Sequence, residues 1–201
     1  LKGANNIISP NGFDPDYIAN VLSKRKNVSF FAAPTMLKLF MESGSVGGDI
    51  SGLKTICYGG GPMYLSDIKQ ALRIFGRSLY QLYGQGESPM TISNVTKKMH
   101  YGLDNIEQDH ILSSVGIART GVEIAIVSPR GEEMPIDSIG EIVTRSACVM
   151  SGYLNNDRAT ENTLRNGWLY TGDVGSMDKY GILTLKDRSK DMIISGGMNI
   201  Y

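Results

Sequence analysis

The sequence has little cysteine and no long run of apolar residues. Its two cysteines, Cys57 and Cys148, lie far apart and follow no metal-ligand spacing. Both lie in apolar, strand-like stretches, so we expect buried free thiols in a reducing, cytoplasmic compartment. No apolar stretch is long enough to span a bilayer, and no signal peptide is visible.

An excess of charge of either sign is also absent. The 201 residues include 20 basic and 20 acidic side chains. Nucleic acid and anionic membranes are usually bound by a strongly basic surface, so we expect neither as a partner. The chain is long enough to bury a substantial core, in one large or two small domains.

Glycine, in contrast, is abundant. The 24 glycines cluster at apparent turns without forming a repeat, which predicts a loop-rich binding surface. The chain begins at Leu1 and ends at Tyr201, just after a strand pattern has begun. We therefore expect a piece of a longer protein, truncated at both ends, whose cut sheet edges favour self-association.

The first part of the chain alternates strand and helix patterns. This alternation is typical of a parallel sheet with crossover helices, and it predicts an α/β subdomain over residues 1–112. Asp14 and Pro15 predict the start of the first helix. We expect buried strands at 28–32, 53–58 and 78–83, with helices from residue 34 and from residue 66.

The pattern changes after about residue 112. Short strand patterns separated by turn clusters predict an antiparallel β subdomain over 113–187, shaped as a small barrel or a curled sheet. One helix, at about 157–164, interrupts it. The residues that follow, 188–201, lead into a separate part. The expected strands are 122–127, 140–144, 168–171 and 182–186.

Two glycine-bearing loops follow strands of the predicted parallel sheet, where ligands usually bind. The first, 59–63, contains Gly59, Gly60 and Gly61, which permit close backbone approach to a flat ring or a phosphate. The second, 84–89, contains Glu87, a possible ligand for Mg²⁺ beside nucleotide phosphates. A tight strand-to-helix connection and a solvated carboxylate explain the same residues without any ligand.

A carboxylate and a guanidinium flank a predicted hairpin near the end of the chain. Gly172 lets the strand turn so that it presents Asp173. The turn at 178–181 begins with Asp and ends with Gly, and the strand after it leads to Arg188. This pair suits a ligand that carries both a diol and a phosphate, and a surface ion pair is the alternative.

Several segments, in this order, resemble motifs of the adenylate-forming superfamily, which includes acyl-CoA synthetases, luciferases and the adenylation domains of peptide synthetases. Residues 83–87 are similar to Tyr-Gly-x-Thr-Glu, and residues 170–173 match Tyr-Thr-Gly-Asp. Residues 140–155 and 187–193 resemble two further motifs of that superfamily. The similarity covers nearly the whole chain, which would be an internal part of the large N-terminal domain.

The resemblance implies a two-step reaction. A carboxylic acid reacts with ATP to give acyl-AMP and pyrophosphate, and the thiol of coenzyme A then displaces AMP. By this resemblance Gly59, Gly60 and Gly61 pass beside the adenine, and Tyr83 packs on it. Gly84 and Gly86 belong to the nucleotide motif, Glu87 holds Mg²⁺, and Asp173 and Arg188 bind the ribose region. Lys190 is the hinge of the C-terminal domain, and Gly196 and Gly197 adjoin the pantetheine arm.

Two departures from the superfamily pattern affect the expected activity. Gly86 replaces a threonine whose hydroxyl contacts the α-phosphate, so either a backbone N–H makes that contact or adenylation is weaker. The phosphate loop would precede Leu1 and the catalytic lysine would follow Tyr201, so we expect these 201 residues alone to be inactive. An acyl-CoA synthetase is the leading hypothesis. The alternatives are a fatty-acyl-AMP ligase, a peptide-synthetase adenylation domain, or a non-catalytic nucleotide-binding module.

Overall fold

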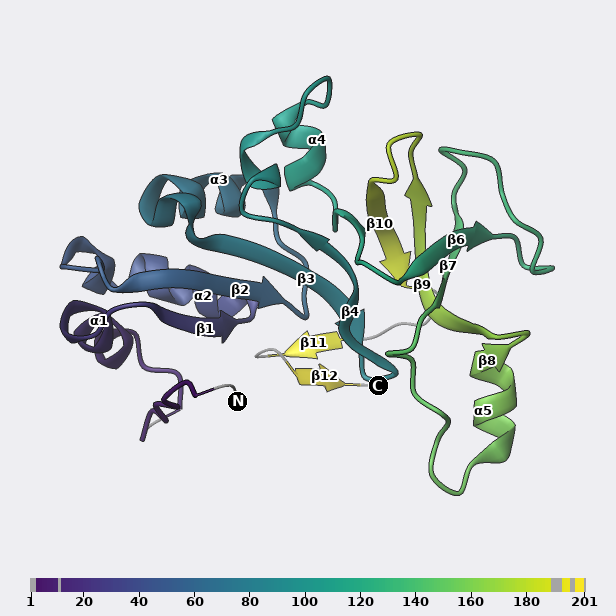
Figure 1. Cartoon of the computed structure of the whole chain (residues 1–201), viewed down its shortest axis with the longest axis horizontal. Helices are drawn as coiled ribbons and strands as arrows, with labels where there is room; N and C mark the ends of the chain where they lie inside the picture. The colour runs from purple at the N-terminus through teal and green to yellow at the C-terminus, as the bar shows by residue number, and fades with distance from the viewer. Residues whose placement is uncertain (1–2, 11, 189–192, 196–197, 201) are drawn as a thin grey trace.

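The computed structural model describes residues 3–10, 12–188, 193–195 and 198–200. The chain forms two sheets that lie next to each other, one with helices packed on it and one curled and largely bare (Figure 1). The first sheet comes from the purple-to-teal half of the chain and the second from the green-to-yellow half. The predicted α/β part followed by an antiparallel β part is therefore confirmed.

The first sheet has the strand order β1-β2-β3-β4-β5. Its first three strands are parallel, as predicted, with α2 and α3 as crossovers; the last two are antiparallel. β1 is an edge strand that is only partly buried, because it has a neighbour on one side alone. The bounds are α1 Pro15–Lys24, β1 Val28–Ala32, α2 Pro34–Glu42, η1 Ser45–Gly47, β2 Leu53–Gly59, α3 Leu65–Phe75, η2 Gly76–Ser78, β3 Leu79–Gln85, β4 Ser88–Val95, η3 Met99–Tyr101, α4 Gln108–Leu112 and β5 Ile117–Ala118.

The helices and the first sheet enclose the largest hydrophobic core. Leu22 of α1, Phe40 of α2 and Ile68 of α3 are fully buried in it. Phe40 also stacks on Phe75, with ring centroids 5.6 Å apart. Asp14 caps α1 as predicted, since its carboxylate accepts the backbone N–H groups of the first turn. This core fixes the directions of β2 and β3, whose carboxyl ends lead into the two glycine-bearing segments.

The segment expected to be a loop at 84–89 is instead the tip of a hairpin between β3 and β4. The sequence analysis did not predict β4, because the buried positions of this strand include polar residues. Ser93 donates to the Val115 carbonyl at 2.6 Å, and the Asn94 amide donates to the Tyr80 hydroxyl at 2.8 Å. A strand whose buried side chains are polar has no apolar alternation to reveal it.

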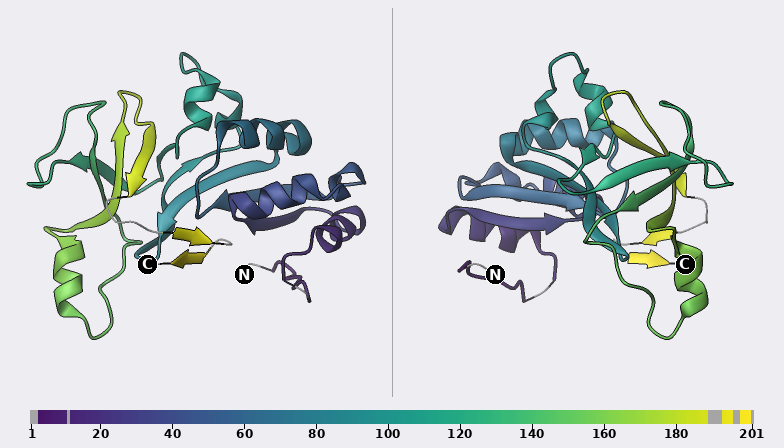
Figure 2. Two further views of the ribbon diagram at one scale, coloured as in Figure 1. Left: turned by 180° about the vertical axis from the view of Figure 1, so that it is seen from behind. Right: turned by 45° about the vertical axis from the view of Figure 1, so that its right-hand side comes forward.

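The second sheet has the order β10-β9-β7-β6, with β8 paired to β9, and every pairing is antiparallel. It curls away from the first sheet, as the rotated views show (Figure 2). Ile126, Ile142 and Leu183 on its inner face pack against Tyr83 and Ile92 of the first sheet. The bounds are β6 Glu123–Val127, β7 Gly140–Arg145, α5 Asp157–Thr163, β8 Leu164–Arg165, β9 Trp168–Met177, β10 Leu183–Arg188, β11 Ile193–Ser195 and β12 Met198–Ile200.

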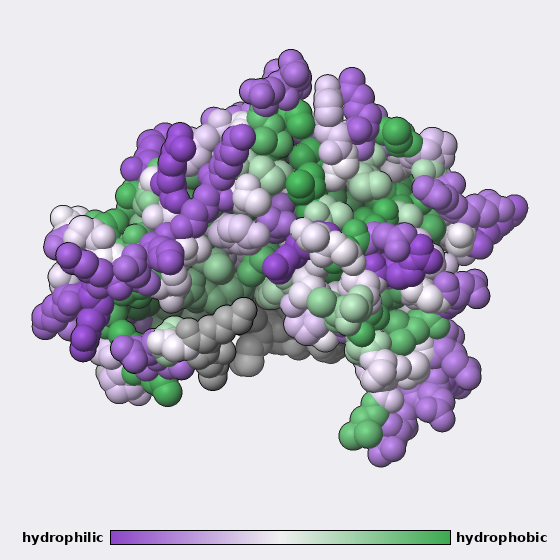
Figure 3. Space-filling view, in the orientation of Figure 1, coloured by the Kyte–Doolittle hydropathy of each residue, from purple (hydrophilic) through white to green (hydrophobic). Residues whose placement is uncertain are grey.

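Figure 3 shows hydrophilic side chains along the rim of the molecule in the orientation of Figure 1. No helix in the described part of the chain is both long and apolar enough to cross a bilayer.

The prediction of two buried thiols is wrong for Cys148. Both cysteines are free, but Cys148 is exposed and Cys57 is half-buried. Cys148 lies in a turn after β7, where its backbone N–H donates to the Ser146 hydroxyl at 3.2 Å. Its apolar neighbours resemble a strand locally, but β7 has already ended at Arg145. Burial of Cys57 on β2 raises its thiol pKa.

A buried histidine links β2 to η3. His100 has no exposed surface, its Nδ1 lies 2.7 Å from the Thr96 carbonyl oxygen, and its Nε2 lies 2.9 Å from the Tyr58 hydroxyl. Because a carbonyl can only accept, Nδ1 carries a proton, and in the neutral ring Nε2 accepts a hydrogen bond from the Tyr58 hydroxyl. Burial lowers the pKa of His100 from 6.5 to about 4, so the ring is neutral near pH 7.

This shift predicts a loss of stability in mild acid. The unfolded chain binds a proton at His100 below about pH 6.5, whereas the folded chain does so only near pH 4. Stability is therefore fully present above pH 6.5 and falls as the pH drops towards 4, by about 3 kcal/mol in total. Urea unfolding at pH 7, 5.5 and 4.5 measures this slope.

His100→Gln removes the titrating group and is expected to flatten the slope. His110→Gln is the matched control, because the His110 side chain is partly exposed and pairs with Asp178 at the surface. An equally steep pH dependence in His100→Gln and the unmodified chain would contradict the assignment.

Candidate functional site

A bulge in β9 presents Asp173. In the pairing of β7 with β9, Glu141 lies opposite Val174 and Val143 lies opposite Tyr170. Residues 171–173 therefore oppose the single residue Ile142, and such a bulge bends the strand. Gly172 takes a φ of +71°, a conformation that side-chain-bearing residues rarely adopt. The glycine before the carboxylate is thus required by the backbone.

Side chains hold this bulge in place. The Thr171 hydroxyl donates to the Ile142 carbonyl at 2.7 Å and accepts the Asp173 backbone N–H at 3.1 Å. The Glu141 carboxylate accepts the Gly172 backbone N–H at 3.0 Å. These bonds replace ladder hydrogen bonds that the bulge removes, so the backbone under Asp173 is fixed.

The Asp173 carboxylate is bonded to the first sheet. Only 3% of Asp173 is exposed, and its Oδ2 accepts a hydrogen bond from the Tyr83 hydroxyl at 2.6 Å. Tyr83 comes from β3 and Asp173 from β9, so the two sheets meet at this bond. A buried carboxylate is costly without donors, and the phenol satisfies part of that need.

The β9–β10 hairpin brings Arg188 opposite Asp173. The two residues are partners in the strand register, as the sequence predicted. The hairpin turn is closed by Asp178, whose Oδ1 accepts the backbone N–H groups of Tyr180 and Ile182, each at 2.8 Å. Hydrogen bonding from His110 also helps lower the pKa of Asp178, against the opposing effect of its partial burial.

The predicted glycines serve different purposes. A Cβ on Gly59 would overlap the Leu82 carbonyl oxygen of the neighbouring strand, and one on Gly84 would lie 2.5 Å from the Ser88 carbonyl oxygen. These two glycines are therefore explained by strand packing alone. Gly60 takes a φ of +77°, and a Cβ on Gly61 would make only ordinary contacts. Gly86 faces open space at the tip of the hairpin.

Glu87 stands beside Gly86 in the same turn and contacts the loop between β7 and α5. The Tyr153 hydroxyl donates to Glu87 Oε1, and the Met150 backbone N–H donates to the Glu87 carbonyl at 2.8 Å. No cluster of three metal-ligating side chains occurs among the described residues. A metal ion at Glu87 would therefore need most of its ligands from a bound molecule or from water.

The structure thus gathers most of the predicted site residues at one place. Gly60 lies next to the Met90 side chain just beyond the Glu87 turn, and Tyr83 joins that hairpin to Asp173. Lys190, Gly196 and Gly197 lie outside the described residues. The arrangement offers a buried carboxylate, an aromatic ring, open glycine backbone and a second carboxylate, which together suit a nucleotide.

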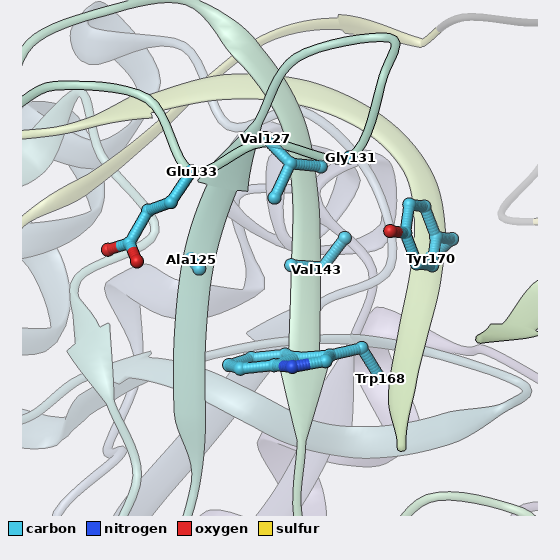
Figure 4. A pocket seen from close by; sticks show the side chains of 7 residues that line it. All are labelled: Ala125, Val127, Gly131, Glu133, Val143, Trp168 and Tyr170. Carbon is cyan, nitrogen blue, oxygen red and sulfur yellow. The ribbon is translucent and has the colours of Figure 1, made fainter. Parts of the chain in front are cut away.

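A pocket on β6, β7 and β9 lies elsewhere and contains none of the predicted site residues. It has a volume of about 170 Å³, with Val143 at its floor and Trp168 and Tyr170 at its sides (Figure 4). Arg145 lies over the Trp168 ring and Arg165 over the Tyr170 ring, at 4.6 and 4.5 Å from the centroids. Trp168 and Tyr170 alternate with the buried Leu169, as a strand with two different faces requires.

Comparison with known proteins identifies the family. The family model described as AMP-binding enzyme matches residues 1–154. The chain belongs to the AMP-binding enzyme family. This agrees with the adenylate-forming superfamily motifs in the sequence.

Three relatives of this chain illustrate the similarity. It is 30% identical to the medium/long-chain-fatty-acid–CoA ligase FadD8 of Mycobacterium tuberculosis, over 100% of this chain and 34% of that protein. It is 32% identical to the amide bond synthetase McbA of Marinactinospora thermotolerans, with a TM-score of 0.85 over 94% of this chain and 37% of that one. The AMP complex of o-succinylbenzoate coenzyme A synthetase from Bacillus subtilis is 28% identical, with a TM-score of 0.73 over 94% of this chain and 37% of that one. The chain thus spans little more than a third of the length of these relatives.

Two contacts near the predicted site residues were missed by the sequence analysis. Glu141 and Tyr153 both lie in the 140–155 motif, but nothing in their local sequence indicates that one braces Gly172 and the other bonds Glu87. Each contact joins residues at least 31 positions apart. The available signal was the 140–155 motif itself. It had no assigned role, and it lies in the sequence between the motifs at 83–87 and 170–173, which had one.

Substitution by alanine is expected to change the stability of the chain differently at the two hairpin glycines, Gly84 and Gly86. Gly84→Ala should lower the free energy of unfolding by about 1–3 kcal/mol, because its methyl group meets the Ser88 carbonyl oxygen. Gly86→Ala should leave stability unchanged or raise it by up to about 1 kcal/mol, because its methyl group meets nothing. Urea unfolding at pH 7 measures both, and equal losses would contradict the hairpin geometry.

Proposed function

We propose that this chain forms the nucleotide-binding part of an ATP-dependent acyl-CoA synthetase. The observation that carries the proposal is the Tyr83–Asp173 pair, with the Arg188 backbone opposite Asp173 in the register. Support comes from membership of the AMP-binding enzyme family, from the fatty-acid–CoA ligase relative and from the related synthetase solved with AMP.

The proposed nucleotide site follows from the chemistry of a nucleoside. Asp173 accepts hydrogen bonds from the two ribose hydroxyls, as a carboxylate with two oxygens can. The adenine packs on the ring of Tyr83, beside Gly59, Gly60 and Gly61. Because the Tyr83 hydroxyl already lies against Asp173, the base and ribose subsites adjoin, as the base and ribose of a nucleoside do.

Glu87 fits the role of a Mg²⁺ ligand in this proposal. Mg²⁺ is typically held by one or two carboxylates together with phosphate oxygens and water, so a single half-exposed carboxylate suffices. Tyr153 engages Oε1 of Glu87, and among the described residues no side chain or backbone group donates to Oε2. When bound, the cation would neutralise phosphate charge.

The proposed reaction has two steps. An oxygen of the substrate carboxylate attacks the α-phosphorus of ATP, and the bond to pyrophosphate breaks. The sulfur of coenzyme A then attacks the acyl carbon, loses its proton, and AMP leaves. The residues of this chain hold the adenosine of both ATP and acyl-AMP in one place, which lowers the barrier by positioning. In the same proposal Lys190 is a hinge and Gly196 and Gly197 adjoin the thiol arm.

An amine is the alternative acceptor for the second step. The similarity to an amide bond synthetase favours it, because an amide and a thioester can form from the same acyl-AMP. The nucleotide site is the same in both cases. We further propose a cytoplasmic location, since Cys57 and Cys148 are both free thiols, and a carboxylic acid as the small-molecule substrate.

Asp173→Asn tests the ribose contact. It keeps the shape of the side chain but removes the charge, and charged hydrogen bonds contribute roughly 1.5–3 kcal/mol each. We expect AMP affinity, measured by calorimetric titration of the 201-residue chain, to fall at least tenfold. Asp109→Ala, which removes an exposed carboxylate paired with Lys69, is the control and should bind AMP normally. Unchanged binding by Asp173→Asn would reject the proposed ribose site.

Gly86→Thr tests the departure from the family motif. Since Gly86 faces open space, we expect the threonine to be accepted without loss of stability. Its hydroxyl would then donate to the α-phosphate and raise AMP affinity by roughly tenfold, the value of one hydrogen bond to a charged group. Gly86→Val has nearly the same shape without the hydroxyl. Equal AMP affinity of the two variants would show that the hydroxyl makes no such contact.

A further inference from the structure

The loop between β7 and α5 makes two hydrogen bonds to Glu87, at the tip of the β3–β4 hairpin. Met150 bonds the backbone carbonyl of Glu87, at 2.8 Å, and Tyr153 bonds its side-chain Oε1. Both donors are more than 60 residues away from Glu87 in the sequence. The position of Glu87 and the direction of its carboxylate are therefore set by a segment outside its own sheet.

Helix α5 in turn fixes Tyr153. The Tyr153 backbone N–H donates to the Thr160 hydroxyl at 2.9 Å, and that hydroxyl donates to the Asn156 carbonyl at 3.0 Å. The Asn156 side chain caps the helix by accepting the Ala159 N–H at 3.1 Å. Thr160 thus joins the start of the helix to the residue that bonds Glu87.

Gly152 lets the loop come this close to α5. A Cβ at Gly152 would lie 2.9 Å from the Thr160 methyl group. The helix contributes none of its own residues to a core and lies at the edge of the second sheet (Figure 1). The contacts that α5 makes through Thr160 therefore hold the conformation of the loop rather than bury apolar side chains.

The direction of the carboxylate matters because a glutamate at the tip of a two-residue turn otherwise samples several rotamers. A phenol that donates to an ionised carboxylate makes a strong, short hydrogen bond, which selects one of them. Such outer partners of ligating carboxylates orient the ligand and strongly affect metal affinity. With Oε1 bonded to Tyr153, Oε2 is the oxygen left for a cation.

We propose that Tyr153 is a positioning residue that holds Glu87 for a divalent cation bound with the nucleotide phosphates. The inference rests on the proposed function, in which Glu87 is a Mg²⁺ ligand. Tyr153 itself does not touch the cation. Its hydroxyl acts through Oε1 of Glu87, while Thr160 of α5 holds its backbone and Gly152 lets the loop approach that helix.

The test is a titration of the 201-residue chain with Mn²⁺ in the presence of ATP, followed by electron paramagnetic resonance of the free ion. Tyr153→Phe removes only the hydroxyl, and we expect Mn²⁺ affinity to fall about tenfold, the lower end of the effect of losing such a partner. AMP affinity in the presence of EDTA should stay within about twofold of the unmodified chain, since the ribose and adenine contacts are unaffected.

Two further variants separate the possible outcomes. Tyr180→Phe is the matched control, because Tyr180 is an exposed tyrosine of the same part of the chain, and it should bind Mn²⁺ normally. Glu87→Gln should lose the Mn²⁺ site, and adding Tyr153→Phe to it should change nothing more, because the hydroxyl acts only through the carboxylate.

The results distinguish this inference from the proposed function. If Glu87→Gln loses Mn²⁺ but Tyr153→Phe binds it normally, the positioning role is overturned and the metal site stands. If Glu87→Gln also binds Mn²⁺ normally, the metal assignment itself fails, and the positioning role with it. If Tyr153→Phe weakens Mn²⁺ and AMP equally, Tyr153 has a general structural role instead.

Discussion

The hydrogen bond from the Tyr83 hydroxyl to the Asp173 carboxylate is the contact on which the site depends. It joins the first sheet to the second at a point where both are buried. Tyr83 also belongs to the hydrophobic cluster shared by the two sheets, together with Ile126 and Ile142. The apolar packing therefore sets the distance between the sheets. At that distance the Tyr83 hydroxyl reaches the Asp173 carboxylate and orients it. A change in how the sheets pack would move Asp173 relative to the Tyr83 ring.

The second constraint is the irregularity of β9. A regular strand would satisfy its ladder hydrogen bonds, but strict alternation alone would then decide the face on which residue 173 lies. The bulge at 171–173 gives up regular pairing, and Thr171 and Glu141 replace part of what is lost. Departures of this kind are common at functional sites, where a side chain must be directed away from the regular lattice.

The site is assembled from three segments that are distant in the sequence. The hairpin of β3 and β4 supplies Tyr83 and Glu87, β9 supplies Asp173, and the loop before α5 supplies Tyr153. Each segment is short and ends at a defined element, so their relative positions follow from the two sheets and from α5. The pocket lined by β6, β7, β9 and the connection that carries Gly131 and Glu133 contains none of the residues that the motifs indicate.

The sequence by itself determined the features that act over a few residues. The Asp14 cap, the turn that begins at Asp178, the three parallel strands and the positive φ at Gly172 all follow from local residue preferences or from periodicity. The motifs added the family, and the hairpin pattern added the pairing of Asp173 with Arg188.

Only the tertiary structure decided what depends on partners distant in the chain. It placed the polar side chains of Ser93 and Asn94 inside β4, left Cys148 exposed, and joined Tyr153 to Glu87. The sequence around a residue with a hydroxyl or a carboxylate is the same whether that group is solvated or bonded to a distant part of the chain. The partner of such a group is set by how the sheets and α5 pack, and the hydrophobic periodicity of the sequence does not predict that packing.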